Sequence, residues 1–198
     1  MEIKKYNHLS KSEVEKFTDL LSEAFRKNEF IFHYLMGENE KRLRRFMKME
    51  LEYQNHFADF YAFVEEDGTL DAAVIYLPVG CEPLGLGTAF SHKMFSTLLK
   101  SFSMQPLKYT KRLLKFSALE DEHWYKDPFI TLDIVVSRVK GCGKKLIEET
   151  LRNYEGQNVA LNSSVGNVEH RYYTQFGFEA YEKLVMDDYT TAMMIKTR

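Results

Sequence analysis

The sequence predicts one domain (residues 1–198) of the α/β (α+β) class, a mixed, mostly antiparallel sheet of about six to seven strands with helices on both faces. Three observations predict it. Apolar residues recur at helical spacing in some segments and form short strand-like runs in others. Asp67-Gly68 and Asp187-Asp188 each join two strand-like segments, as in hairpins. A strand, a glycine-rich turn and a helix follow one another over residues 130–147.

The first half of the chain is expected to supply helices and strands in alternation. The segment Ser10-Lys11-Ser12-Glu13 is a capping box, which predicts the start of a helix. That helix has one apolar face, made by Val14, Phe17, Leu21, Ala24 and Phe25. The other elements expected here are a strand at residues 3–6, a helix around 43–51, and strands at 60–64 and 72–77.

The second half begins with two helical stretches, 89–102 and 107–119, which Pro106 separates. The apolar run at 130–136 then predicts a buried strand, and Leu146, Ile147 and Leu151 predict a helix after it. The remaining elements expected are a strand at 158–164, a short helix that carries Tyr173, and strands at 178–185 and 191–196.

Composition narrows the class of protein. A chain of 198 residues that is 44% hydrophobic can bury one sizeable core. The net charge of −2 gives no electrostatic reason to expect a nucleic-acid partner. No apolar run approaches the ~18 residues of a membrane span, so no membrane partner is expected. The N-terminus lacks the apolar core of a signal peptide, so a cytoplasmic protein is expected. The chain has two cysteines, so a reduced protein is expected. No metal site is expected.

The turn between the strand at 130–136 and the next helix is the most informative segment. Gly141 and Gly143 lie one residue apart and allow a ligand to approach the backbone closely. The cationic side chains around them are Arg138, Lys140, Lys144 and Lys145. Because a helix N-terminus has unpaired N–H groups and a partial positive charge, the segment predicts a site for a phosphorylated anion. The competing interpretation is a tight turn that caps an ordinary surface helix.

Two common phosphate-binding turns do not fit the spacing. A Walker A loop needs a glycine where this chain has Arg138, and a Ser or Thr where it has Lys145. The Rossmann fingerprint needs a third glycine where this chain has Leu146.

A third pattern does fit. The run Arg138-Val139-Lys140-Gly141-Cys142-Gly143 reads Arg/Gln-x-x-Gly-x-Gly/Ala, and it resembles the acetyl-CoA pyrophosphate loop of the GNAT superfamily of acyl-CoA N-acyltransferases. Downstream, Tyr173-x-x-x-Gly177-Phe178 resembles the closing motif of that family, a tyrosine helix with a glycine C-cap. The resemblance covers the element order of essentially the whole chain and is specific over about residues 130–178. One departure is that Val136 and Arg138 are closer together than is usual in the family.

The resemblance implies a cofactor, acetyl-CoA (coenzyme A), and residues that bind it. The pyrophosphate loop corresponds to Arg138, Val139, Lys140, Gly141, Cys142, Gly143 and Lys144. A backbone N–H near Val135 or Val136 would face the acyl oxygen, where two strands separate. Asn167, in an N-cap position, and Tyr173 would also lie at the cofactor, and Tyr173 is the implied acid for the leaving thiolate.

Two assignments stay open at this point. Tyr172 competes with Tyr173, because adjacent residues on a helix point to different faces. The sequence does not identify the general base: Asp133 on the central strand and Asp127, His123 and Tyr125 just before it are candidates, and Asp133 could equally pair with a charge on a neighbouring strand. Cys142 is interpreted as a small spacer, because the family transfers the acyl group directly.

The function expected is transfer of an acetyl group from acetyl-CoA to a primary amine of a small molecule or peptide. The alternatives are a non-catalytic acyl-CoA-binding or regulatory module of the same fold, and a nucleotide-binding protein whose loop only mimics the motif. The sequence does not identify the acceptor. Exposed edge strands near the C-terminus could pair two subunits, so a homodimer is one expected assembly.

Overall fold

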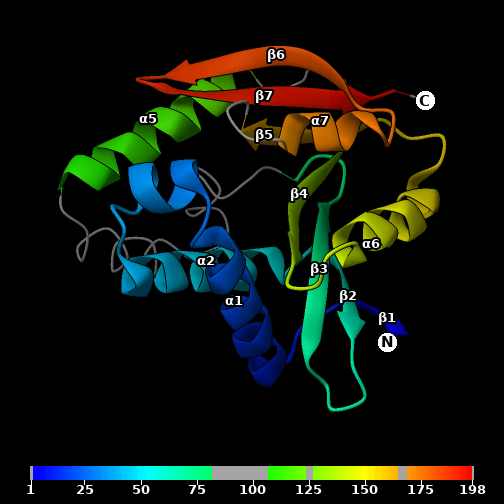
Figure 1. Cartoon of the computed structure of the whole chain (residues 1–198). Helices are drawn as coiled ribbons and strands as arrows, with labels where there is room; N and C mark the ends of the chain where they lie inside the picture. Colours follow the sequence, from blue (N-terminus) through cyan, green and yellow to red (C-terminus); the bar gives the residue numbers. More distant parts are fainter. Residues whose placement is uncertain (1, 82–106, 124–126, 165–168, 198) are drawn as a thin grey trace.

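Seven strands form a single sheet in the order β1-β2-β3-β4-β5-β7-β6 in the computed structural model, which describes residues 2–81, 107–123, 127–164 and 169–197 (Figure 1). The strands are β1 Glu2–Tyr6, β2 Asp59–Val64, β3 Leu70–Leu77, β4 Ile130–Ser137, β5 Val159–Ser164, β6 Glu179–Met186 and β7 Tyr189–Lys196. Every neighbouring pair is antiparallel except β4 and β5, which are parallel. The mixed, mostly antiparallel sheet expected from the sequence is confirmed.

The helices also follow the expected order. They are α1 Lys11–Phe25, the π-helix η1 Glu29–Leu35, α2 Glu40–Gln54, α5 Leu107–His123, α6 Cys142–Leu151, the 3₁₀ turn η2 Arg152–Tyr154 and α7 Glu169–Thr174. The predicted capping box is present, since the Ser10 side chain accepts from the Glu13 N–H and the Glu13 side chain accepts from the Ser10 N–H. The helix expected at 89–102 lies outside the described residues.

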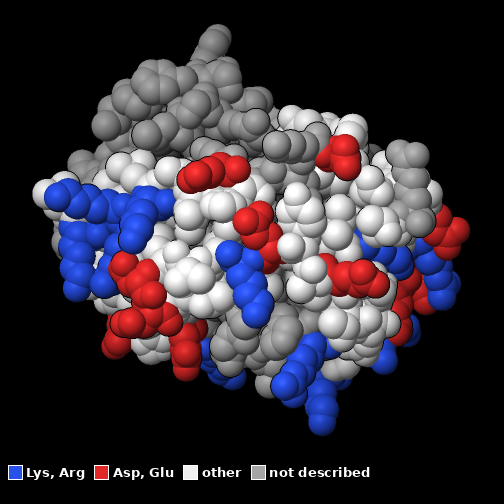
Figure 2. All heavy atoms as spheres, turned by 90° about the horizontal axis from the view of Figure 1, so that it is seen from above, with Lys and Arg blue, Asp and Glu red and all other residues white. Residues whose placement is uncertain are grey.

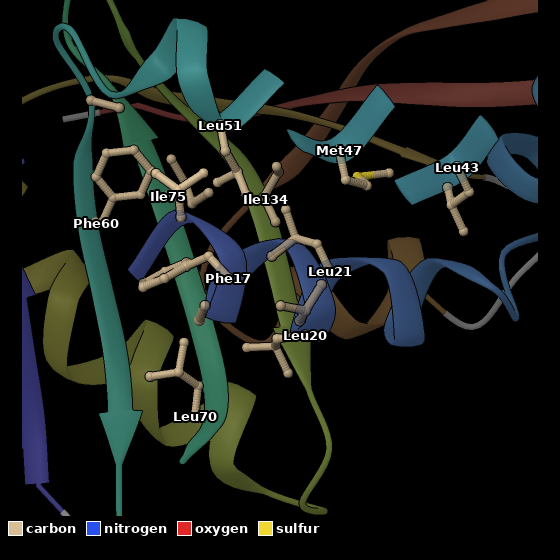
Figure 3. Close-up of a cluster of buried hydrophobic side chains, with 14 of the residues drawn as sticks. Phe17, Leu20, Leu21, Leu43, Met47, Leu51, Phe60, Leu70, Ile75 and Ile134 are labelled. Carbon is tan, nitrogen blue, oxygen red and sulfur yellow. The ribbon is translucent and has the colours of Figure 1, made fainter. Parts of the chain in front are cut away.

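One face of the sheet packs against α1 and α2. Figure 3 shows Phe17, Leu20 and Leu21 of α1 meeting strand residues such as Phe60, Ile75 and Ile134. Leu43, Met47 and Leu51 of α2 complete this cluster, and all of these side chains are buried. The helical spacing of these apolar residues in the sequence is therefore explained by one continuous interface with the sheet.

The opposite face of the sheet packs against α6. Leu146, Ile147 and Leu151 of α6 lie in a second buried cluster together with the strand residues Val74 and Leu132. Phe176 and Phe178, which follow α7, belong to the same cluster. Both faces of the central strands are thus covered, and the start of α6 is held at the end of β4 (Figure 1).

The π-helix η1 was not expected from the sequence. Asn28 caps it by accepting a hydrogen bond from the Ile31 N–H at 2.7 Å. Tyr34 of η1 donates its hydroxyl to Asp187 in the β6–β7 turn, and Lys115 of α5 lies 3.0 Å from the same carboxylate. Burial and the neighbouring Asp187 raise the pKa of Tyr34 to about 12. These contacts connect three segments that are distant in the sequence.

Charges of both signs are mixed on the side of the molecule seen from above. Figure 2 shows Lys and Arg side chains next to Asp and Glu side chains across that face. The face therefore carries no extended field of a single sign. Within the described ranges, no helix is long and apolar enough to cross a membrane, and no group of three or more His, Cys, Asp or Glu side chains has metal-binding geometry.

Candidate active site

The glycine-rich turn connects the end of β4 to the start of α6 over residues 138–141. Gly141 is the N-cap of α6 and has φ 89° and ψ −22°, a left-handed conformation that favours glycine. A Cβ on Gly141 would have no heavy atom within 4 Å, so space is open beside this residue. The helix begins at Cys142, so Gly143 lies in its first turn.

Several backbone N–H groups around this turn are donors without an acceptor among the described residues. Within the ranges that the structure describes, no hydrogen-bond acceptor is found for the N–H groups of Val139, Lys140, Gly141, Gly143 and Lys144. The next N–H, that of Lys145, bonds to the carbonyl of Gly141 and starts the helical ladder. Several adjacent donors at a helix N-terminus, where the helix dipole is positive, form a site suited to an oxyanion.

The cationic side chains of the turn differ in their partners. The guanidinium of Arg138 pairs with Glu23 of α1 at 2.8 Å and donates to the carbonyl of Leu70 at 3.2 Å. The N–H of Arg138 is also taken, by the carbonyl of Asp71. Lys144 lies 3.7 Å from Glu148. Arg138 therefore connects the turn to α1 and β3, and its N–H is not one of the donors without an acceptor.

Two lysines of the turn remain available to an anion. Lys140 and Lys145 are exposed, and neither pairs with a carboxylate in the part of the chain that the structure describes. Lys145 lies 5.7 Å from the ring centre of Phe63. Val139, at the tip of the turn, is 42% exposed. The N–H groups without an acceptor are thus flanked by two cations and by one apolar side chain that could contact a bound ligand.

The parallel strands β4 and β5 separate soon after they begin. Only two pairs of residues are in register, Ile130 with Val159 and Thr131 with Ala160. Among the described strands, β4 pairs only with β3 from Leu132 onward. Figure 1 shows the two strands at the centre of the sheet, with α6 following β4. Beyond residue 131, backbone groups of β4 that point away from β3 therefore have no partner in any strand that the structure describes.

The register identifies which backbone groups these are. In an antiparallel pair, hydrogen-bonded and non-hydrogen-bonded positions alternate. The Arg138 N–H bonds to the Asp71 carbonyl, so Val136, two residues earlier, is also directed toward β3. Val135 then points its N–H away from β3, toward the opening between the strands. Of the two candidates for an acyl-oxygen donor, the register favours Val135.

A bulge in β4 places a carboxylate at this opening. Ile75 pairs with Ile134 and Tyr76 pairs with Leu132, so Asp133 is the extra residue. Bulges change the direction of a side chain and are common beside active sites. Asp133 Oδ2 accepts a hydrogen bond from Nε2 of Gln54 on α2 at 2.7 Å, so the carboxylate lies on the α2 face of the sheet. Burial raises the pKa of Asp133 to about 6, and the Gln54 hydrogen bond opposes the rise.

Two adjacent tyrosines of α7, Tyr172 and Tyr173, pack edge-on to each other with ring centres 5.3 Å apart. The hydroxyl oxygen of Tyr172 would lie 3.8 Å from a Cβ placed on Gly143. Its ring contacts Phe176, and burial followed by the charge of Glu148 raises the pKa of its hydroxyl. The ring of Tyr173 packs edge-on to Phe178, with ring centres 6.1 Å apart. The structure therefore places Tyr172 next to the glycine turn, whereas the role of Tyr173 stays a prediction.

Comparison with solved structures identifies the arrangement of strands and helices. An acetyltransferase from Corynebacterium glutamicum, described as histone acetyltransferase HPA2 and related acetyltransferase, superposes with a TM-score of 0.69 at 15% identity, over 100% of this chain and 97% of its own. A GNAT-family acetyltransferase from Streptococcus agalactiae gives 0.59 at 13% identity, over 99% and 95%. Arylalkylamine N-acetyltransferase-like 5b from mosquito gives 0.60 at 14% identity, over 98% and 99%.

The chain has the GNAT fold. At these identities the likeness is one of architecture. The sequence itself matches no family model and no curated protein.

Within the GNAT fold, most residues singled out from the sequence lie around the end of β4. Val135, the turn from Arg138 to Gly141 and the first turn of α6 are contiguous there, and Tyr172 of α7 reaches the same place. Cys142 is buried, as expected of a spacer. Asn167 and Tyr125 lie outside the described residues.

The sequence did not predict two contacts at the site: Gln54 donates a hydrogen bond to Asp133, and Glu23 pairs with Arg138. Gln54 had a recognisable signal, because it continues the apolar stripe of Met47 and Leu51 at helical spacing and is itself 2% exposed. A polar side chain in a core position needs a partner. Glu23 had no such signal, because it is an ordinary residue of an exposed helix face until the fold brings it to Arg138.

Proposed function

We propose that this protein is an N-acetyltransferase, which transfers an acetyl group from acetyl-CoA to a primary amine. The observation that carries the proposal is the combination at the end of β4. N–H groups without an acceptor at the start of α6 follow strand β4, which separates from its parallel neighbour β5. The carboxylate of Asp133, whose pKa is raised, lies where the two strands separate. The GNAT fold of the chain supports this interpretation.

The residues present fit acetyl-CoA. The N–H groups of Val139, Lys140, Gly141, Gly143 and Lys144 and the side chains of Lys140 and Lys145 would hold its diphosphate. Glycine at 141 leaves that side of the backbone open. Acetyl-CoA, when bound, supplies an acetyl group that is already activated as a thioester. The Val135 N–H is the proposed donor for the acyl oxygen, which gains negative charge during transfer.

Asp133 is the proposed general base. A carboxyl group with a pKa of about 6 is mostly ionised at neutral pH and can still take a proton efficiently. As the amine nitrogen bonds to the acyl carbon, it becomes acidic and gives its proton to Asp133. A tyrosine hydroxyl of α7 would give its proton to the coenzyme A thiolate as the bond between acyl carbon and sulfur breaks. Tyr173 is proposed from the motif and Tyr172 from its position beside Gly143.

The acceptor amine is proposed to approach on the α2 face of the sheet, where Asp133 lies. The side chains of Asn162 on β5 and Thr191 on β7 point to that face, because the alternate residues Leu161 and Ala192 pack on the α6 side. Thr191 is buried, and its hydroxyl has no hydrogen-bond partner within the described ranges. These polar groups favour an acceptor that carries hydrogen-bonding groups near its amine.

The test is thiol release from acetyl-CoA with a panel of small amines and peptides. We expect turnover with at least one amine, and a fall of roughly 100-fold or more in kcat for Asp133→Asn. Acetyl-CoA should also raise the melting temperature, because it binds only the folded chain. If acetyl-CoA binds and no amine is acetylated, the protein is a non-catalytic acyl-CoA-binding module and the enzyme proposal fails. If ATP with magnesium stabilises the fold and acetyl-CoA does not, the turn is a nucleotide site.

A further inference from the structure

Gln54 lies at the C-terminal end of α2, where its side chain meets Asp133 of β4, which is 79 residues away in the sequence. The contact is a hydrogen bond of 2.7 Å from Gln54 Nε2 to Asp133 Oδ2. Gln54 is 2% exposed, so its amide is removed from water. A buried donor of this kind fixes the direction of the carboxylate that it holds.

The second polar atom of the Gln54 amide has no such partner. Its Oε1 is buried, and no donor for it is found within the part of the chain that the structure describes. A buried carbonyl oxygen without a hydrogen bond lowers stability, and a methionine of similar shape would avoid that cost. The presence of glutamine at this position is therefore better explained by its contact with Asp133 than by packing in the core.

We propose that Gln54 is a positioning residue for the general base, which orients the Asp133 carboxylate toward the opening between β4 and β5 and favours its ionised form. The inference rests on the proposed function, in which Asp133 takes the proton of the amine.

The groups that act on Asp133 are few. Burial raises its pKa, and the Gln54 hydrogen bond lowers it; no Asp, Glu, His, Lys or Arg of the described residues contributes. On β3, Ile75 and Tyr76 flank the bulge, and the Tyr76 hydroxyl bonds to Thr150 of α6 on the opposite face of the sheet. Among the described residues, burial and the neutral amide of Gln54 are thus the two influences on the pKa of the Asp133 carboxyl group.

The test uses Gln54→Met, which keeps the volume and removes the donor. We expect the pKa of Asp133 to rise by about one unit, since a hydrogen bond to a charged group is lost. It is measured by carbon NMR of the labelled aspartate carboxyl groups, with Asp133→Asn to assign the signal. The acid limb of the kcat/KM profile should move upward with it, and the KM for acetyl-CoA should not change. The matched control is Gln157→Met, in the turn before β5, which should leave both readouts as in the wild type.

Several outcomes would overturn the inference. An unchanged pKa for Asp133 in Gln54→Met shows that the hydrogen bond has no influence, whether or not the enzyme proposal holds. A shifted pKa with an unshifted acid limb also removes the positioning role. Gln54→Glu provides a second variant if Gln54→Met does not fold. With two adjacent carboxyl groups, the pKa of Asp133 should rise further, and an unraised value again contradicts the inference. If no amine of the panel is acetylated while the pKa of Asp133 rises as expected in Gln54→Met, the enzyme proposal is overturned instead.

Discussion

Replacing Asp133 by asparagine should stabilise the fold at neutral pH while removing the proposed base. Burial raises the pKa of this carboxyl from its ordinary value of 3.8 to about 6. The folded protein thus holds a proton that the unfolded chain has already released. Stability from this group is fully present at low pH and is lost as the pH rises through about 4 to 6. Two pKa units correspond to about 3 kcal/mol, which sets an upper figure for the stability that ionisation removes.

The asparagine side chain carries no charge and can still accept the hydrogen bond from Gln54. We therefore expect Asp133→Asn and the wild type to have similar free energies of unfolding near pH 4, and the variant to become more stable by up to about 3 kcal/mol near pH 8. The assay is urea denaturation at several pH values from about 4 to about 8, because other titrating groups cancel in the difference between the two proteins.

The control is Asp127→Asn, since Asp127 is an exposed aspartate just before β4. Its difference curve against the wild type should show no comparable rise with pH. Parallel stability curves for Asp133→Asn and the wild type across the whole range would refute the reasoning, because they would mean that burial does not penalise the charge of Asp133. The proposed role as a base near neutral pH would then lose its physical support.

Three further predictions concern the turn, α7 and η1. Gly141→Ala and Gly156→Ala both place a side chain at positive φ in open space, and each should lower the free energy of unfolding by about 1 kcal/mol. Calorimetry should show weaker coenzyme A binding only for Gly141→Ala. Tyr173→Phe should lower kcat with little change in coenzyme A affinity, whereas an effect confined to Tyr172→Phe would transfer the acid role to that residue. Tyr34→Phe should lower the free energy of unfolding by about 1 kcal/mol at neutral pH. That loss should shrink in acid, because the hydroxyl of Tyr34 holds the pKa of its partner carboxylate below 3.8 and this stabilisation disappears as the carboxylate is protonated.

The elements of this fold were largely predictable because their signals are local. A capping box, two hairpin turns and the apolar spacing of each helix all act through backbone geometry within a few residues. The same is true of the glycine turn, since Gly141 has a left-handed conformation, which favours glycine. The exception among the elements is η1, whose run of aromatic and aliphatic residues has no distinct helical period.

The partners of individual side chains were not predictable in the same way. Arg138 was expected at the phosphate, and the structure gives its guanidinium to Glu23, 115 residues away. Asp133 could not be told from the other candidates for the base in the sequence, and the structure adds that it lies at a bulge and accepts a hydrogen bond from Gln54. Such contacts depend on how two elements pack, and sequence spacing within either element carries no record of the other.

The sequence by itself determined that a strand, a glycine-containing turn and a cationic helix start would meet in one place, because these residues are consecutive in the chain. Only the tertiary structure decided that β4 leaves β5 after Thr131, and which carboxylate lies in the opening that results. Strand separation and burial depend on the surroundings of a residue. The pKa of a single aspartate is therefore set by the assembled sheet and α2, and by no feature of the chain near it.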